Sequence, residues 1–304
     1  MLDCAYKQCG FRFNKPSTAL EPLRRRESRY VAILIMASVV AGVIGQAAEI
    51  SSASVDERGF LSHKVTGTYQ ETDTEIKVLL PDDFSPDKVY RVLYVLPVES
   101  GAGTQFGHAL DEIRRLGLHS KWSLVCVYPT FSQSSWYADN PLNLQISQES
   151  YFVKEVLPFI EEAYPVLSER RGRLLVGFSK SGWGAFSLLL RHMDTFEKAA
   201  AWDAPLAQTE PAQWRYFAQK FGTVENFQNY RIDLLLKKRA ADLKNRAARL
   251  ILMGYGGQRH LYVGTHDLML CLGIPHAYLD GPERKHMWDS GWLPDAVRLL
   301  ADGS

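Results

Sequence analysis

The stretch LLVGFSKSGWGA, residues 174–185, places a serine, Ser179, between an apolar strand pattern and an apolar helix pattern. This Gly-x-Ser-x-small spacing is typical of a nucleophile elbow, a turn so sharp that only small side chains fit two residues before and after the serine. Gly177 and Ser181 meet that requirement. The turn would also aim the N–H of Lys180 at a developing oxyanion. The alternative is a glycine-rich or phosphate-binding turn, although neither G-K-[ST] nor G-x-G-x-x-G spacing is present.

A serine nucleophile needs a base that accepts its proton, and we predict that this base is His286. In proteins built on such an elbow the chain order is serine, acid, histidine. His286 lies in a polar loop, GPERKHMWDSGW, between the last predicted strand and the last predicted helix. His192 falls within a helix pattern and His276 begins a strand, so we expect structural roles for both.

The elements that must position these residues are predicted from periodicity and from turn residues. Strands are expected at Glu75–Leu80, Tyr90–Leu96, Trp122–Tyr128, Arg173–Phe178, Lys198–Trp202, Arg249–Met253 and His276–Leu279. Helices are expected at Phe106–Leu116, Glu149–Tyr164, Ser181–His192, Ile232–Ala247, Leu261–Leu272 and Trp292–Leu300.

Several of the strand patterns, such as LLVGF and LILMG, are apolar throughout rather than alternating. Such strands are buried on both faces, which indicates an α/β fold with a mostly parallel sheet between layers of helices. Ligands of such sheets bind beyond the carboxyl ends of the strands. We expect one domain over residues 49–304, with an inserted cap at 205–230, where aromatic and polar residues interrupt the alternation.

Residues 1–48 have the pattern of an export signal. A basic head is followed by the uncharged run VAILIMASVVAGVIG and then by small residues before Glu49. A basic region, an apolar region and small residues near a cleavage point are typical of a signal peptide. We therefore expect either a cleaved signal or a retained N-terminal anchor, and a secreted or periplasmic protein. The alternative is a buried helix.

Composition narrows the function classes. The formal net charge is +1, with 35 Lys+Arg against 34 Asp+Glu. Nucleic-acid binding normally requires a concentrated basic surface, so no nucleic-acid partner is expected. No second apolar run is long enough to span a membrane. His260 and His266 lie six residues apart without a third ligand nearby, and no cysteine spacing matches a zinc site, so we expect no metal.

Five segments together resemble the Putative esterase family of α/β-hydrolases, which includes S-formylglutathione hydrolase, feruloyl esterases, enterobactin esterase and the antigen 85 mycolyltransferases. They are RVLYVLP, SSWYADN, ESYFVKEVLPFIEEAY, GFSKSGWGA and HMWDSGW, and the resemblance extends over roughly Thr74 to Ala301. It implies an α/β-hydrolase fold and serine-dependent cleavage of acyl esters without a cofactor. It also places the catalytic histidine at His286.

The catalytic acid departs from the family pattern. Relatives carry Asp or Glu just after the strand that here reads LILM, yet residues 254–266 contain no carboxylate. Asp203 ends the apolar strand pattern KAAAW, and a carboxylate that closes such a run requires a partner. We therefore favour Asp203, with Asp267 at the start of the following helix as the alternative acid. A turn, capping or helix-terminal charge role would be the structural interpretation of either residue.

The segment that would supply the second oxyanion donor also differs from the family pattern. The family supplies it from a His-Gly segment, whereas residues 97–103 read PVESGAG. Proline has no N–H, so the backbone of Val98 or Glu99 must donate, and we favour Val98. The Glu99 side chain would either repel the anion or face a substrate hydroxyl. Trp136 and Tyr137 are expected to form the wall of an acyl or sugar pocket, with simple loop packing as the alternative.

These features predict an exported serine esterase that forms an acyl-enzyme on Ser179 and acts on a small-molecule or polysaccharide-linked ester. Two alternatives remain. A hydrolase-fold binding protein that has lost turnover would explain the empty acid position and the proline in the oxyanion segment. An acyltransferase would use the same serine with an alcohol in place of water.

Overall fold

The computed structural model describes residues 48–304, except 102, 211–213, 255 and 303–304 and the side chains of 214–216. The predicted signal or anchor at 1–48 therefore lies outside the described residues, apart from Ala48. The described residues belong to one unit, Gly45–Ser304. Within this described part, no helix combines the length and apolar character needed to cross a membrane.

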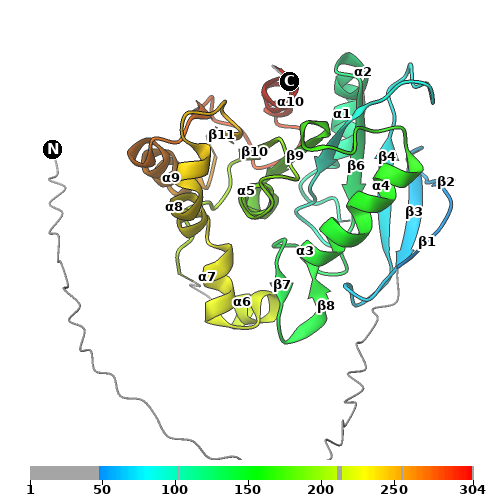
Figure 1. Ribbon diagram of the computed structural model, residues 1–304. Helices are drawn as coiled ribbons and strands as arrows, with labels where there is room; N and C mark the ends of the chain where they lie inside the picture. Colours follow the sequence, from blue (N-terminus) through cyan, green and yellow to red (C-terminus); the bar gives the residue numbers. More distant parts are fainter. Residues whose placement is uncertain (1–47, 102, 211–213, 255, 303–304) are drawn as a thin grey trace, which may run out of the picture. The chain divides into compact units, whose positions relative to one another are not determined.

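A ten-stranded sheet runs through the described part of the chain (Figure 1). Its order is β1-β3-β4-β6-β5-β9-β10-β11-β12, with β2 paired to β3. Neighbouring strands from β6 to β12 are parallel, and the pairings of β1 to β4, including that of β4 with β6, are antiparallel. The strands are β1 Glu49–Ile50, β2 Ser54–Val55, β3 Leu61–Thr66, β4 Thr74–Leu79, β5 Arg91–Val95, β6 Leu124–Pro129, β9 Arg173–Phe178, β10 Lys198–Trp202, β11 Leu250–Met253 and β12 His276–Leu279.

Helices cover both faces of the sheet, which confirms the predicted α/β class (Figure 1). One hydrophobic core lies beneath α3, α4, α5 and α8, and a second lies beneath α1, α2 and α10. Every residue of β9 is buried, as its continuous apolar pattern predicts. The helices are α1 Ala109–Arg115, α2 Leu118–Lys121, α3 Gln148–Tyr151, η1 Phe152–Val156, α4 Leu157–Ala163, η2 Arg170–Gly172, α5 Ser179–Arg191, α6 Trp214–Phe221, α7 Val224–Tyr230, α8 Ile232–Leu243, α9 Arg259–Leu272 and α10 Leu293–Ala301.

The predicted strands and helices all occur, with strand bounds within two residues of those predicted. The helix expected at Glu149–Tyr164 is interrupted by the π-helical turn η1. The antiparallel strands β1 to β3 were not predicted, because one face of each is polar and the segments are short. The stretch 205–230, expected to be a cap, contains α6 and α7, which lie beside the hairpin of β7 (Asp139–Asn140) and β8 (Asn143–Ser147) (Figure 1).

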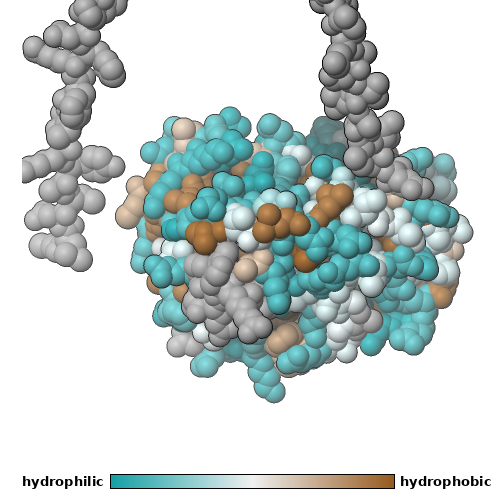
Figure 2. Space-filling view, turned by 90° about the horizontal axis from the view of Figure 1, so that it is seen from below, coloured by the Kyte–Doolittle hydropathy of each residue, from teal (hydrophilic) through white to brown (hydrophobic). Residues whose placement is uncertain are grey.

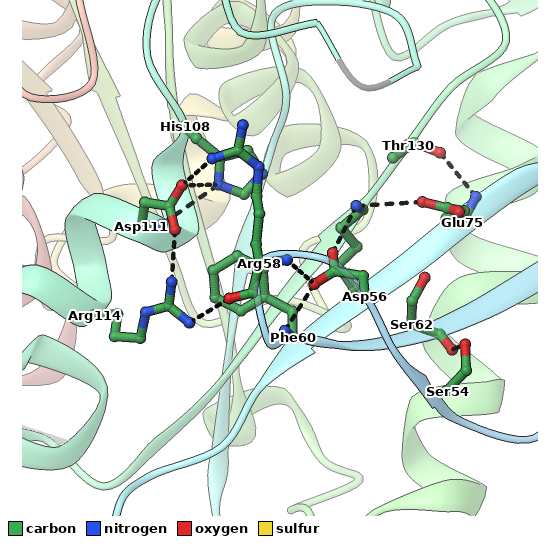
Figure 3. A network of polar contacts seen from close by, with 11 residues as sticks. Ser54, Asp56, Arg58, Phe60, Ser62, Glu75, His108, Asp111, Arg114 and Thr130 are labelled. Carbon is green, nitrogen blue, oxygen red and sulfur yellow. Dashed lines mark hydrogen bonds and ion pairs between the residues drawn. The ribbon is translucent and has the colours of Figure 1, made fainter.

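A polar network ties these unpredicted strands to α1 (Figure 3). The Asp56 carboxylate accepts hydrogen bonds from the N–H groups of Arg58 (3.0 Å) and Phe60 (2.8 Å) and from Lys77 Nζ (2.8 Å). The Arg58 guanidinium in turn donates to Asp111 Oδ2 in α1 at 2.6 Å. The turn before β3 is thereby fixed against the helix that follows the predicted oxyanion segment.

Glu155 lies in η1 with its side chain buried against Gly67. A Cβ built on Gly67 would lie 2.7 Å from Glu155 Oε2, so only glycine leaves room for this carboxyl group. Its Oε2 has no hydrogen-bond partner among the described residues. Burial raises the pKa of Glu155 from its ordinary value of 4.5 to about 7.

We expect the Glu155→Gln variant to change the pH dependence of stability. Because the folded-state pKa is raised, the folded protein binds more protons than the unfolded chain, and the unfolding free energy falls as pH rises from about 4.5 through about 7. At pH 8 the variant should be more stable than the parent by about 1–2 kcal/mol after allowance for solvent screening. At pH 4.5 the difference should vanish. Urea unfolding at both pH values measures it, and equal slopes in both proteins would contradict the assignment.

Candidate active site

Ser179 is located at a sharp turn between β9 and α5. Its backbone φ is +52°, an uncommon value for a residue with a side chain. A Cβ on Gly177 would lie 2.4 Å from the carbonyl of Ser181, so the turn requires glycine there. The Ser181 hydroxyl donates to Phe178 O at 2.9 Å and accepts from Phe178 N–H at 3.1 Å. The strand, turn and helix expected of a nucleophile elbow are therefore present.

His286 and Asp203 lie together beside this elbow. His286 Nδ1 is 2.7 Å from Asp203 Oδ2. A carboxylate can only accept, so Nδ1 carries a proton, and in the neutral imidazole the lone pair then lies on Nε2. The His286 ring is 4.9 Å, between centroids, from the ring of Phe178, which directly precedes Ser179. No described residue is hydrogen-bonded to the Ser179 hydroxyl or to His286 Nε2.

The Asp203 side chain is completely buried at the carboxyl end of β10. Its second oxygen, Oδ1, accepts the backbone N–H of Gln258 at 2.8 Å. The loop after β11, which carries the acid in the family pattern, instead folds around this carboxylate. A Cβ on Gly254 would lie 2.8 Å from Asp203 N, and one on Gly256 would lie 2.3 Å from Asp203 Oδ2. Residues 254–266 thus contain no carboxylate of their own, but Gly254 and Gly256 leave the space that the Asp203 carboxylate occupies from the end of β10.

Asp267, the alternative acid, is placed differently from the prediction. It does not open a helix but lies in the middle of α9, which begins at Arg259, and it is exposed. No hydrogen bond or ion pair joins it to His286 in the described structure. Three of the other histidines are paired away from this site. His192 contacts Glu149 Oε1 at 2.6 Å, and His266 Nδ1 contacts His276 Nε2 at 2.8 Å.

Aromatic rings surround His286 and fix its orientation. The ring centroids of Phe106 and Trp202 are 5.7 Å and 6.1 Å from that of the imidazole. The loop that carries His286 is also attached directly, because Trp288 N–H donates to Phe106 O at 2.9 Å. Three chain segments therefore hold the imidazole in place, and 30% of its side chain remains exposed for a substrate.

The two backbone N–H groups predicted to hold the oxyanion belong to Val98 and Lys180. Val98 follows β5 and is 2% exposed, and Lys180 is the second residue of α5. Neither backbone N–H has an acceptor among the described residues. The Lys180 side chain points elsewhere and donates to Ser134 Oγ at 2.5 Å. Unpaired N–H groups at a helix N-terminus suit an anion.

Glu99 was expected to face a substrate hydroxyl or to repel the oxyanion, and the structure shows a further role in its own loop. Its carboxylate accepts the backbone N–H groups of Gln105 (3.0 Å) and Phe106 (3.4 Å). It therefore closes its own loop and presents Phe106 to His286. The sequence did not predict this role, because the role depends on the conformation of the loop and no sequence motif indicates that conformation.

Trp136 and Tyr137 were expected to line a substrate pocket, but both side chains are buried. Tyr137 is 0% exposed and Trp136 is 6% exposed. The Trp136 ring packs against Phe217 and Phe221 of α6, and also against Trp183 of α5, so the loop-packing alternative describes it better. Helix α6 consequently rests on the loop that carries Trp136 and Tyr137.

Gln148 is a further residue of this region that the sequence did not reveal. Its Oε1 accepts the backbone N–H groups of both Trp136 (2.8 Å) and Tyr137 (3.0 Å). A glutamine at the start of a helix carries no spacing signal. Only the long-range contact identifies it as the support of this loop.

We predict that Gly256→Ala impairs the site and that Gly257→Ala does not. The added methyl group at 256 must displace the Asp203 carboxylate, whereas a Cβ at 257 has nothing within 4 Å. A displacement of about 1 Å costs on the order of 10²-fold in rate. The rate at which a fluorophosphonate probe labels Ser179 should therefore fall about 10²-fold in the first variant only. Equal rates in both variants would show that the glycine loop does not position the acid.

Comparisons with known proteins identify the family of this chain. Residues 67–258 match the model of the family described as Putative esterase, a range that includes Ser179 and Asp203. An esterase of Mycobacterium tuberculosis, Esterase Rv1288, is 29% identical over 135 residues, which are 43% of this chain and 29% of that protein. The match therefore spans less than a third of the relative's length.

Solved structures show the same fold. The fluorophosphonate-binding serine hydrolase FphF of Staphylococcus aureus superimposes with a TM-score of 0.67 at 17% identity, over 83% of this chain and 100% of that chain. S-formylglutathione hydrolase of Agrobacterium tumefaciens gives a TM-score of 0.65 at 14% identity, over 83% and 98%. The chain has the α/β-hydrolase fold and belongs to the Putative esterase family.

Proposed function

We propose that this protein is an exported serine esterase that hydrolyses carboxylic esters through an acyl-enzyme on Ser179. The observation that carries the proposal is the hydrogen bond of 2.7 Å between His286 Nδ1 and the buried Asp203 carboxylate, beside a serine held at φ +52°. Family membership and fold support an esterase function, and this geometry supplies the residues.

The proposed reaction has two steps, acylation of Ser179 and hydrolysis of the acyl-enzyme. Ser179 Oγ attacks the ester carbonyl carbon while His286 Nε2 accepts the hydroxyl proton. The N–H groups of Lys180 and Val98 stabilise the oxyanion of the tetrahedral intermediate. The C–O bond to the alcohol then breaks, and His286 returns the proton to the leaving oxygen. Water repeats the sequence on the acyl-enzyme and releases the carboxylic acid.

Asp203 contributes by holding His286 in the reactive tautomer and by stabilising the imidazolium that forms. This role also answers the main argument for a protein that has lost turnover. That argument rested on the empty acid position after β11, and Asp203 reaches the imidazole from β10 instead. The structure therefore favours an active enzyme over a binding protein.

The substrate proposed is a small-molecule or polysaccharide-linked ester. The face that carries α6, α7 and the β7–β8 hairpin is largely hydrophilic, with hydrophobic residues at several places among the polar ones (Figure 2). The proposed export makes extracellular esters, such as acylated polysaccharides, suitable candidates. Acyl transfer uses the same steps with an alcohol replacing water, and added acceptors distinguish the two reactions through their products.

Hydrolysis of short p-nitrophenyl esters by the whole chain should depend on Ser179. We expect the Ser179→Ala variant to lose at least about 10³-fold in kcat, because the other serine of the elbow, Ser181, is 0% exposed and its hydroxyl is bonded to the Phe178 backbone. Release of p-nitrophenol measures the rate, and the folded state of the variant is checked by circular dichroism. Turnover retained in a folded Ser179→Ala protein would refute the serine mechanism.

The acid is tested by the same assay with a matched pair of variants. Asp203→Asn removes the acceptor that fixes His286 and should lower kcat by on the order of 10⁴-fold. Asp267→Asn changes an exposed carboxylate in α9 and should leave kcat within about twofold of the parent. The reverse ranking would transfer the acid role to Asp267.

Export is proposed from residues 1–48 alone. When the full chain is produced in a bacterial host, we expect the protein outside the cytoplasm, with its N-terminus near residues 46–49 if the signal is cleaved. Cell fractionation followed by N-terminal sequencing measures both features. Membrane-bound protein with an intact N-terminus would indicate the anchor, and protein confined to the cytoplasm would refute export.

A further inference from the structure

We propose that Tyr137 and Ser135 are positioning residues that orient the Pro97–Val98 peptide, so that the Val98 N–H faces the oxyanion. The inference deepens the proposed function and rests on it. Neither residue touches the substrate in this account, and each acts through the carbonyl oxygen of Pro97.

The Pro97 carbonyl accepts two side-chain hydrogen bonds. Tyr137 Oη donates to it at 2.6 Å and Ser135 Oγ donates at 3.0 Å. Both donor side chains are 0% exposed, so water does not compete for this oxygen. Burial also raises the pKa of Tyr137, which keeps the phenol protonated as a donor. A buried carbonyl with two donors has little freedom to rotate.

Fixing this carbonyl fixes the direction of the Val98 N–H. Carbonyl and N–H belong to one planar peptide unit and point in opposite directions when the bond is trans. The only cis bond among the described residues is Gly281–Pro282, so the Pro97–Val98 bond is trans. The Val98 N–H therefore points away from Tyr137 and Ser135. It is buried there without an acceptor in the described structure, which is unusual unless a ligand supplies one.

Tyr137 is itself held in a strained and crowded place. Its φ is +54°, in a region that a bulky residue rarely adopts. A Cβ on Gly184 would lie 2.1 Å from the Tyr137 ring, so the ring is pressed against α5. Gln148 anchors the Tyr137 backbone N–H at 3.0 Å. Helix α5 also presents the Lys180 N–H, so Tyr137 connects the two proposed oxyanion donors through one rigid side chain.

This arrangement explains how the chain can carry Pro97 where the family has a His-Gly segment. Proline at position 97 donates no hydrogen bond, but its carbonyl remains a strong acceptor. The serine in SSWYADN, Ser135, and the tyrosine of the same segment both bind that carbonyl. The segment thus serves the oxyanion site and not the pocket wall that its aromatic residues suggested.

The test compares Tyr137→Phe with Tyr151→Phe in the full chain. Tyr151 is the matched control, because it is also 0% exposed, also packs edge-on against Phe131 and also makes one buried hydrogen bond, to Thr74 at 2.8 Å. Both variants lose one buried hydroxyl and should unfold at similarly lowered temperatures. Only Tyr137→Phe should lower kcat for p-nitrophenyl acetate, by about tenfold, with KM unchanged.

A second readout follows the oxyanion directly. A boronic acid forms a tetrahedral adduct on a reactive serine, and its inhibition constant should rise about tenfold in Tyr137→Phe, in parallel with the loss of kcat. The double variant Tyr137→Phe/Ser135→Ala frees the carbonyl completely and should lose about 10²-fold.

Three outcomes would overturn the inference. Unchanged kcat in Tyr137→Phe would show that the peptide keeps its orientation without the phenol. An equal loss of kcat in Tyr151→Phe would assign the effect to general destabilisation. A kcat loss without a matching change in boronic acid affinity would place the effect outside the oxyanion site. Failure of the proposed function is recognised separately, since turnover would then be absent from the unaltered chain or independent of Ser179.

Discussion

The Asp203 carboxylate is completely buried, and the surrounding structure is arranged to satisfy it. A buried carboxylate without partners costs several kcal/mol, so each of its oxygens must be bonded. His286 takes one oxygen at 2.7 Å and the Gln258 N–H takes the other at 2.8 Å. Gly254 and Gly256 leave the space that the carboxylate occupies. The loop after β11, the end of β10 and the loop before α10 are therefore mutually dependent.

Backbone strain is concentrated at the same place. Five described residues other than glycine have positive φ, and three of them are Ser179, Asp203 and Tyr137. Each such conformation costs on the order of 1–3 kcal/mol and persists only where neighbours enforce it. Gly177 leaves room for the turn at Ser179, and Gly254 and Gly256 leave room for Asp203. The Tyr137 ring is held in place by its close packing against Gly184. Strain at three separate chain positions converges on one proposed reaction centre, which a purely structural role would not require.

Sequence reasoning succeeded where the information is local. The buried parallel strands and the elbow are local patterns of residue type, and so the α/β class and the serine's setting could be predicted. Asp203 could be selected because a charge that ends an apolar strand needs a partner. The glycine cradle, the Glu99 loop closure and the Tyr137 contact to Pro97 could not be predicted, because each joins segments that are distant in the chain. The strands β1 to β3 were missed because β1 and β2 have two residues each and β3 carries the polar residues Ser62, His63 and Lys64 in its middle.

The catalytic acid and the second oxyanion donor present the same problem in this chain. In both, the chain has lost the residue that the family pattern supplies locally, a carboxylate after β11 and a His-Gly segment after β5. In the first case, the buried Asp203 carboxylate reaches His286 from the end of β10. In the second, the buried Tyr137 phenol donates to the Pro97 carbonyl and so orients the peptide that carries the proposed donor. Such contacts depend on the fold being intact, so we expect activity to be lost with the first local loosening of the loops at 97–106 or 254–258, before global unfolding. The proposed catalytic geometry therefore depends on tertiary packing more than on local motifs.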